Sequence, residues 1–238
     1  MASMKRVGEG DGGSGGGAGA PRILVVCRGN VRRSPAAAAM LSAGGLTGFA
    51  VVSAGTEALV GDGLDQTMAA ELRAREIAVP DHRARVLTPR EVERADLVLT
   101  LERSYRSEVV RMVPSAVRRS FTLRELAALL AELGPESVSG TTPAQRLASM
   151  LEQVPGQRAF RQRRHASADD LGDLRRATPR ATRELATEID RSVQPLITAL
   201  SSTAGREDGQ PASQARSSIH HLRSAAANAR LQQIKSAR

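Results

Sequence analysis

Apolar residues follow two patterns along this chain: short unbroken runs, and longer stretches in which they recur every three or four positions. Short runs rich in β-branched residues are typical of strands buried in a parallel sheet, and the spacing of three and four indicates helices with one buried face. The runs predict four strands, at residues 22–27, 49–53, 95–101 and 117–121. The periodic stretches predict helices at residues 34–44, 64–77, 102–112 and 178–201, a short capped helix that begins at Thr88, and another helix that begins at Thr122. This alternation predicts an α/β fold, an open parallel four-stranded sheet with helices on both faces in a three-layer sandwich.

The pattern fades at both ends of the chain and in one internal stretch. Residues 1–20 are Gly-rich and lack periodic apolar positions, so we expect a disordered leader followed by one domain at residues 21–201. Within that domain we interpret residues 131–168 as a long inserted lobe or loop, with a short helix near Leu147 to Leu151. Residues 202–238 are polar and then basic, and we expect a mostly disordered tail rather than a weak amphipathic helix that docks on a membrane or nucleic acid.

Composition narrows the class of protein. The 238 residues include 34 Lys and Arg against 25 Asp and Glu, a net charge of +9 spread along the chain, which favours a solvated surface over a stable nucleic-acid complex. No apolar run approaches the ~18 residues of a membrane span. One cysteine allows no internal disulfide and predicts a cytoplasmic protein. The four His and single Cys form no coordinating cluster, so we expect neither a metal nor another cofactor.

Chemistry concentrates where the first predicted strand ends. That strand finishes on Cys27, a six-residue loop follows, and Ser34-Pro35 opens an alanine-rich helix. A strand, a short loop and a helix N-terminus together present backbone N–H groups and the positive end of the helix dipole to one point, which favours an anion. Arg33 adds a planar fork that can hold two oxygens of a tetrahedral oxyanion. The same positive field favours the thiolate form of Cys27, which is the nucleophilic form.

The Cys-x5-Arg-Ser pattern of residues 27–34 closely resembles the phosphate-binding loop of the low-molecular-weight protein-tyrosine phosphatases. Ser-Ala-Gly-Thr at residues 53–56 and His-x-Ala-Arg at residues 82–85 are similar to two further elements of that family. The resemblance implies that Cys27 is the nucleophile and Arg33 a catalytic residue. It also implies that Asn30 adopts a left-handed backbone supported by Ser53 and His82. The remaining residues that it assigns to the phosphate-binding loop are Arg28, Gly29, Val31, Arg32 and Ser34.

The general acid is the weakest part of this resemblance. An Asp-Pro-aromatic element precedes the last helix in the family, and Asp173 occupies the matching position. Leu174 stands in place of the proline and Arg175 in place of the aromatic residue, so the loop lacks the restriction that proline imposes on φ. Asp170 is the alternative acid, and a purely structural anion near the N-terminus of the last helix is the other interpretation.

The resemblance implies hydrolysis of phosphate monoesters through a cysteinyl-phosphate, with phosphotyrosine in a protein as the expected substrate. The charge of Arg28 and Arg32 suits an anionic phosphopeptide but does not single out phosphotyrosine. Two alternatives stay open: a phosphatase-like module that binds phosphoproteins and turns over poorly, and an arsenate reductase. Reductases that share this loop use additional cysteines, so a chain with one cysteine would need an external thiol.

Overall fold

The computed structural model describes residues 19–161, 169–172 and 178–201, all of which belong to one compact unit, residues 1–202. The expected disordered leader, apart from Gly19 and Ala20, and the expected disordered tail at 202–238 lie outside the described residues, as does Asp173. These expectations therefore stay predictions.

A four-stranded, all-parallel sheet forms the middle layer, as predicted. Its strands are ordered β2-β1-β3-β4, and Ile23 of β1 lies opposite Val51 of β2 on one side and Leu97 of β3 on the other. The side chains of residues 23–26 are fully buried, because helices cover both faces of β1. The strands are β1 (Arg22–Cys27), β2 (Ala50–Gly55), β3 (Leu97–Thr100) and β4 (Ser120–Thr122).

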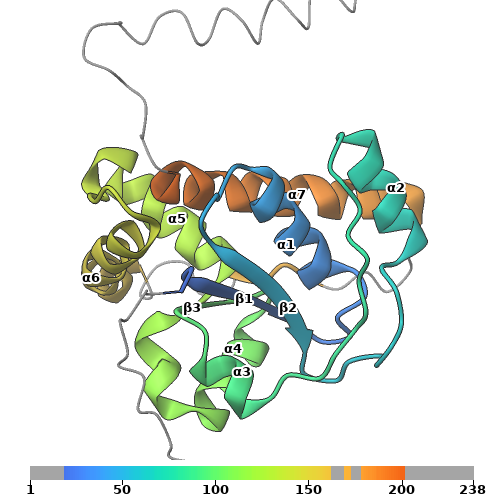
Figure 1. Cartoon of the computed structure of the whole chain (residues 1–238), viewed down its shortest axis with the longest axis horizontal. Coiled ribbons are helices and arrows are strands. Elements are labelled where there is room, and N and C mark those ends of the chain that lie inside the picture. Colours follow the sequence, from blue (N-terminus) through green and yellow to red (C-terminus); the bar gives the residue numbers. More distant parts are fainter. Residues whose placement is uncertain (1–18, 162–168, 173–177, 202–238) are drawn as a thin grey trace, which may run out of the picture. The chain divides into compact units, whose positions relative to one another are not determined.

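Helices form the two outer layers (Figure 1). The face with α1 carries α7, which packs against α1, α2 and α5, while α4 packs on the opposite face against β3 and β4. The helices are α1 (Arg33–Ala43), α2 (Gln66–Ala74), α3 (Pro89–Glu93), α4 (Arg103–Met112), α5 (Leu123–Leu133), α6 (Pro143–Arg161) and α7 (Pro179–Leu200), with short 3-10 helices η1 (Pro114–Arg119) and η2 (Pro135–Ser137). Among the described residues, no helix is both long and apolar enough to cross a bilayer.

Side-chain caps explain where several helices begin. Thr88 and Thr122 each accept a hydrogen bond from the backbone of a glutamate three residues later, whose carboxylate accepts in return from the threonine backbone. The predicted helix starts at both threonines are therefore confirmed.

The prediction of a strand at residues 117–121 is wrong in its first half. Residues 114–119 form η1, and β4 is limited to residues 120–122. Arg119 explains the difference, because its guanidinium donates to the backbone oxygens of Ala95, Ser115 and Val92 and thereby holds the turn of η1 in place.

Within residues 131–168 the helix expected near Leu147 to Leu151 is longer than predicted, and the interpretation of the segment as an inserted lobe stays a prediction. The first part continues α5 and forms η2, and α6 then runs for 19 residues. Leu147, Met150 and Val154 form its buried stripe. Pro155 lies inside this helix. Proline in a helix interior removes one hydrogen bond and usually marks a helix end, so the sequence does not indicate that the helix continues past this residue.

Candidate active site

The candidate site lies at the carboxyl end of β1, where the strand order reverses. The chain crosses from β2 on one side of β1 to β3 on the other, and ligands of open parallel sheets bind at such points. A pocket of about 370 Å³ opens there. It is lined by residues 27–33 together with Glu57 and Leu59, so the structure brings together seven consecutive residues that the sequence singles out.

The loop between β1 and α1 turns its carbonyl groups outward. The carbonyl oxygens of residues 27–29 and 31 accept hydrogen bonds from backbone N–H groups in the segment 56–65, at 2.7–3.1 Å. The carbonyl of Asn30 accepts from the His82 ring. Because the C=O and N–H of a trans peptide point in opposite directions, these contacts direct the N–H groups of residues 28–32 toward the pocket. The loop is thus shaped as an anion cradle by the segment wrapped around it.

Asn30 holds the bend of this loop. Its φ of 54° lies in the left-handed region, as the resemblance implies, and asparagine tolerates that region better than most residues. The side-chain amide donates to Ser53 Oγ and Ser34 Oγ, both at 2.9 Å, and its oxygen accepts from the Arg85 backbone N–H at 3.0 Å. His82 Nε2 lies 2.5 Å from the Asn30 carbonyl oxygen and must donate to it.

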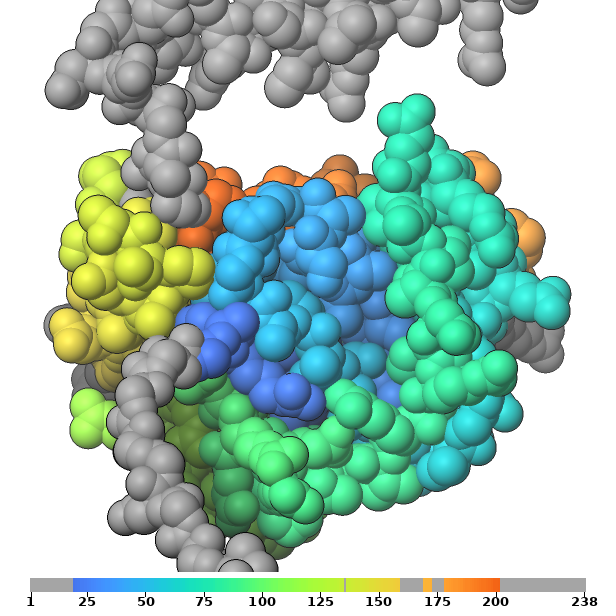
Figure 2. All heavy atoms as spheres, in the orientation of Figure 1, coloured from blue at the N-terminus to red at the C-terminus, as the bar shows by residue number. Residues whose placement is uncertain are grey.

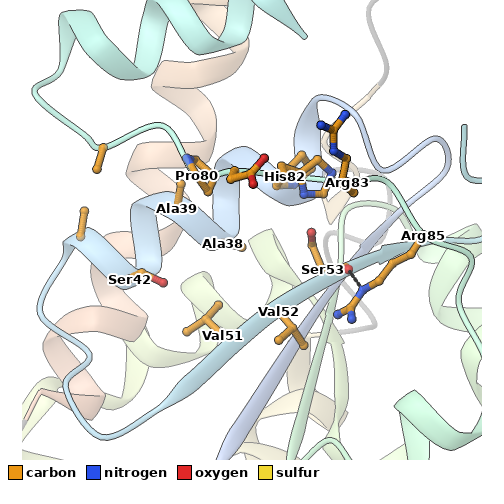
Figure 3. Close-up of a pocket in the computed structure, with 14 residues that line it drawn as sticks. Ala38, Ala39, Ser42, Val51, Val52, Ser53, Pro80, His82, Arg83 and Arg85 are labelled. Atoms are coloured by element: carbon orange, nitrogen blue, oxygen red, sulfur yellow. Dashed lines mark hydrogen bonds between the residues drawn. The ribbon is translucent and has the colours of Figure 1, made fainter. Parts of the chain in front are cut away.

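Behind this network lies a second, larger hollow of about 620 Å³ (Figure 3). Its walls are one side of α1, the edge strand β2 and the segment that follows α2, on the face seen in Figure 2. Ser53, His82 and Arg85 all border it, so the support of Asn30 is reached from outside the catalytic pocket.

Cys27 and Ser34 meet at the bottom of the loop. The Cys27 side chain is buried, and its Sγ lies 2.9 Å from Ser34 Oγ. Ser34 Oγ also accepts from the Asn30 amide, so its own proton is available for the sulfur. This contact places a hydroxyl donor directly at the sulfur.

Arg33 begins α1 and turns beneath the loop. Its side chain is 2% exposed, forms an ion pair with Glu102, and donates to the Leu171 carbonyl at 3.0 Å and to Tyr105 OH at 3.2 Å. A buried guanidinium of this kind supplies a fixed positive charge where the loop N–H groups converge.

The rim of the pocket combines charge with apolar surface. Arg28 pairs with Glu57 at 2.7 Å, both largely exposed, and Arg32 pairs with the half-buried Asp65 at 3.2 Å. Burial would raise the pKa of Asp65, but hydrogen bonds from the Met68 N–H and Thr67 and the charge of Arg32 outweigh it and hold that pKa below its usual value. Leu59 lines the pocket and is 54% exposed.

The two candidate acids have different outcomes. Asp173 lies outside the described residues. Asp170 is described, and its carboxylate accepts from the Arg103 backbone N–H at 2.8 Å and pairs with the Arg103 side chain. Since Arg103 is the first residue of α4, Asp170 acts as an anion at that helix N-terminus. The neighbouring Leu171 is fully buried and bonded to Arg33, which brings the segment that precedes Asp173 to the loop.

Sequence reasoning missed Glu102 and Tyr105, and it assigned no role to Gly55 and Arg85 of the motifs at residues 53–56 and 82–85. Glu102 follows β3, the neighbour of β1 across the strand reversal, so its place in the sheet order is the signal that could have found it. Gly55 allows close contact: a Cβ there would lie 2.4 Å from the Arg28 carbonyl oxygen. Among the described residues, no three His, Cys, Asp or Glu side chains are grouped as a metal site.

Comparisons with known proteins identify relatives of this loop and fold. The family model described as low molecular weight phosphotyrosine protein phosphatase matches residues 22–132. A protein named probable low molecular weight protein-tyrosine-phosphatase EpsP, from Ralstonia nicotianae, is 38% identical over 104 residues, which are 44% of this chain and 71% of that protein.

Two solved structures share the fold. The YwlE arginine phosphatase from Geobacillus stearothermophilus has a TM-score of 0.54 and 25% identity, over 74% of this chain and 90% of that one. The Erwinia amylovora tyrosine phosphatase AmsI has a TM-score of 0.56 and 23% identity, over 78% of this chain and 96% of that one, a likeness of fold alone.

Proposed function

Because the chain belongs to the low-molecular-weight protein-tyrosine phosphatase family, we propose that it hydrolyses phosphate monoesters on proteins, with phosphotyrosine as the substrate group. The observation that carries this proposal is the position of Cys27 Sγ at the bottom of a loop whose carbonyls are bonded outward, beside the buried Arg33. A dianionic PO3 group matches that arrangement of donors in charge and in shape.

In the first step, the Cys27 thiolate attacks phosphorus in line with the leaving oxygen. The S–P bond forms while the P–O bond breaks, and the loop N–H groups and Arg33 hold the three equatorial oxygens. In the second step, water attacks phosphorus, the S–P bond breaks and inorganic phosphate leaves. Ser34 Oγ donates to the sulfur at 2.9 Å, which makes the thiolate a better leaving group.

We assign the proton transfers to Asp173. It protonates the leaving oxygen in the first step and accepts the proton of the attacking water in the second. Asp170 is less suited to this task, because its carboxylate is already held by the backbone N–H and the side chain of Arg103. Leu171, two residues before Asp173 in the sequence, donates its N–H to the Leu101 carbonyl and accepts from Arg33, which holds residues 169–172 beside the loop.

The rim supports a protein substrate with an aryl phosphate. Leu59 and Val31 offer apolar contact for a ring, and Arg28 and Arg32 favour an anionic peptide. We also place the protein in the cytoplasm, since its one free cysteine needs a reducing compartment to stay nucleophilic.

Peptide hydrolysis tests the substrate class. We expect the wild-type chain to release phosphate from a phosphotyrosyl peptide faster than from the same peptide with phosphoserine or phosphoarginine, and Cys27→Ser to be inactive. After a rapid acid quench, phosphate should be found on Cys27. Faster release from the phosphoarginyl peptide would replace the tyrosine assignment with the activity named for the G. stearothermophilus structure. No turnover of any of the three would support the binding-module alternative.

A leaving-group comparison tests Asp173. Asp173→Asn should slow phenyl phosphate hydrolysis much more than p-nitrophenyl phosphate hydrolysis, because the nitrophenolate needs little protonation. Asp170→Asn is the matched control and should slow both esters equally. The reverse pattern would make Asp170 the acid.

A further inference from the structure

Tyr105 is the only tyrosine of the chain, and it lies directly against Arg33. It belongs to the first turn of α4, the helix that follows β3, so its ring reaches the same edge of the sheet as the phosphate-binding loop. The residue is 7% exposed, and the Arg33 Cζ lies 5.6 Å from the ring centroid, within the range of a cation–π contact.

The Tyr105 hydroxyl connects the two ends of an ion pair. It accepts from Arg33 NH2 at 3.2 Å and donates to Glu102 Oε1 at 3.1 Å, while Arg33 NH1 itself pairs with Glu102. Burial raises the pKa of Tyr105, and the nearby carboxylate of Glu102 adds to that shift against the opposing effect of Arg33. The hydroxyl therefore keeps its proton at neutral pH and can serve both partners.

These contacts hold two different nitrogens of one planar group. Glu102 and the Leu171 carbonyl bind NH1, and Tyr105 binds NH2. Contacts to both nitrogens together fix the orientation of the guanidinium plane. Donors fixed before an oxyanion arrives need no reorganisation when it binds.

We propose that Tyr105 is a positioning residue for Arg33: its hydroxyl fixes the orientation in which the guanidinium meets the phosphoryl oxygens. The proposal rests on the proposed function in that both use the same anion pocket. It extends that function by adding a residue on α4, a layer away from the loop. It also makes the lone tyrosine a reporter of pocket occupancy.

Tungstate, a tetrahedral oxyanion that cannot be hydrolysed, separates this proposal from catalysis. We expect Tyr105→Phe to bind tungstate about tenfold more weakly than wild type in calorimetry, the loss typical of a hydrogen bond to a charged group. Ser107→Ala removes a hydroxyl from the exposed side of the same helix, where it bonds only to a backbone carbonyl, and should bind like wild type.

Two further measurements distinguish positioning from a general effect on the fold. In an Arg33→Lys background, Tyr105→Phe should cost little further affinity, since the residue acts through the guanidinium. The single tyrosine Cζ signal in the carbon-13 NMR spectrum of the wild-type protein should shift on titration with tungstate. This measurement needs no variant, and so stands even if Tyr105→Phe is poorly folded.

The outcomes are separable. Equal affinity of Tyr105→Phe and wild type, an equal loss in the Arg33→Lys background, or an unmoved tyrosine signal at saturating tungstate would each overturn the positioning role. A wild-type protein that binds tungstate with the expected dependence on Tyr105 but hydrolyses no phosphate ester would overturn the proposed function alone.

Discussion

At the scale of single residues, the hydrogen-bond partners of Ser34 determine to which atom its hydroxyl donates. A hydroxyl can donate once, and the Asn30 amide already occupies an acceptor position of Ser34 Oγ. The hydroxyl proton then has two acceptors in reach, Cys27 Sγ at 2.9 Å and the Ala54 carbonyl at 3.5 Å, and the nearer one is the sulfur. Asn30 thus shapes the loop and also orients the donor that serves the nucleophile.

We predict that Ser34→Ala lowers kcat by roughly tenfold to a hundredfold, the cost of one hydrogen bond to a charged group. The loss should fall on the second step, because the thiolate then leaves without a donor. Stopped-flow hydrolysis of p-nitrophenyl phosphate should show a burst of nitrophenol followed by a slower steady state than in the wild type. Ser42→Ala, on the same helix but outside the pocket, is the control. An unchanged kcat would contradict the role of Ser34.

The carboxylate of Asp65 makes the stability of the fold depend on pH. Its pKa is held below the usual value, so its carboxylate stabilises the fold above the unfolded-state pKa of about 3.9, and this stabilisation is lost as pH falls through the folded-state pKa. Asp65→Asn keeps an acceptor for the Met68 N–H but removes the charge near Arg32. We predict a loss of about 0.5–1 kcal/mol at pH 7 in urea unfolding, and no difference in acid below the folded-state pKa. Asp62→Asn, an exposed neighbour, should differ little at either pH. A constant difference across pH would exclude the charge as the cause.

At the scale of elements, the end of β2 supports the phosphate-binding loop. The backbone N–H groups of Thr56 and Glu57 bond the carbonyls of Cys27 and Arg28, and Gly55 packs against Asn30 without a side chain between them. The shape of the loop between β1 and α1 therefore depends on the close contact at Gly55.

Gly55→Ala tests that contact. The added Cβ would lie 2.4 Å from the Arg28 carbonyl oxygen and 3.0 Å from Asn30, and backbone must move to relieve it. We predict a fall in kcat/KM of about a hundredfold, as expected when a loop that positions reacting groups shifts by roughly 1 Å. Gly63→Ala, whose Cβ would be 3.9 Å from its nearest neighbour, is the matched control. Wild-type activity in Gly55→Ala would show that the loop tolerates the displacement.

The elements that could be predicted are those whose signals are local. The run that ends at Cys27 and the caps at Thr88 and Thr122 each identify an element from a few adjacent residues, and the structure confirms them. Helix α6 was predicted too short because Pro155 suggests a helix end, while packing against α5 and α7 keeps the helix intact. Packing between distant segments overrides a local signal there.

The same limit explains the site residues. The support of Asn30 by Ser53 and His82 could be anticipated from the family resemblance, and the contacts are present. The resemblance does not point to Glu102 and Tyr105, because their contact with Arg33 spans about 70 residues of sequence and depends on how β3 and α4 lie beside β1. Asp173 stays a prediction, since it lies outside the described residues.

At the scale of the whole molecule, much of the arginine content serves the backbone. Arg119 binds three backbone carbonyls, the buried Arg146 binds those of Ala199 and Gly140, and Arg106 binds those of Ser120 and Val117. Such groups satisfy carbonyls near the ends of helices and strands. These arginines therefore have structural roles within the fold, and that no stable nucleic-acid complex forms stays a prediction.

The single cysteine sets a property of the whole chain, its response to peroxide. Peroxide converts the Cys27 thiolate to a sulfenic acid, and no second thiol exists in 238 residues to capture that sulfur as a disulfide. A second equivalent then gives the sulfinic acid, which thiols do not reduce.

We predict that wild-type activity lost to excess hydrogen peroxide is not restored by dithiothreitol after catalase treatment. Arg32→Cys places a thiol within the same loop, where it can displace water from the sulfenic acid, and most of its activity should return. Arg32→Ser removes the same charge without adding a thiol and should be lost like wild type. If Arg32→Cys recovers no better than Arg32→Ser, the absence of a second cysteine is not what makes the oxidation irreversible.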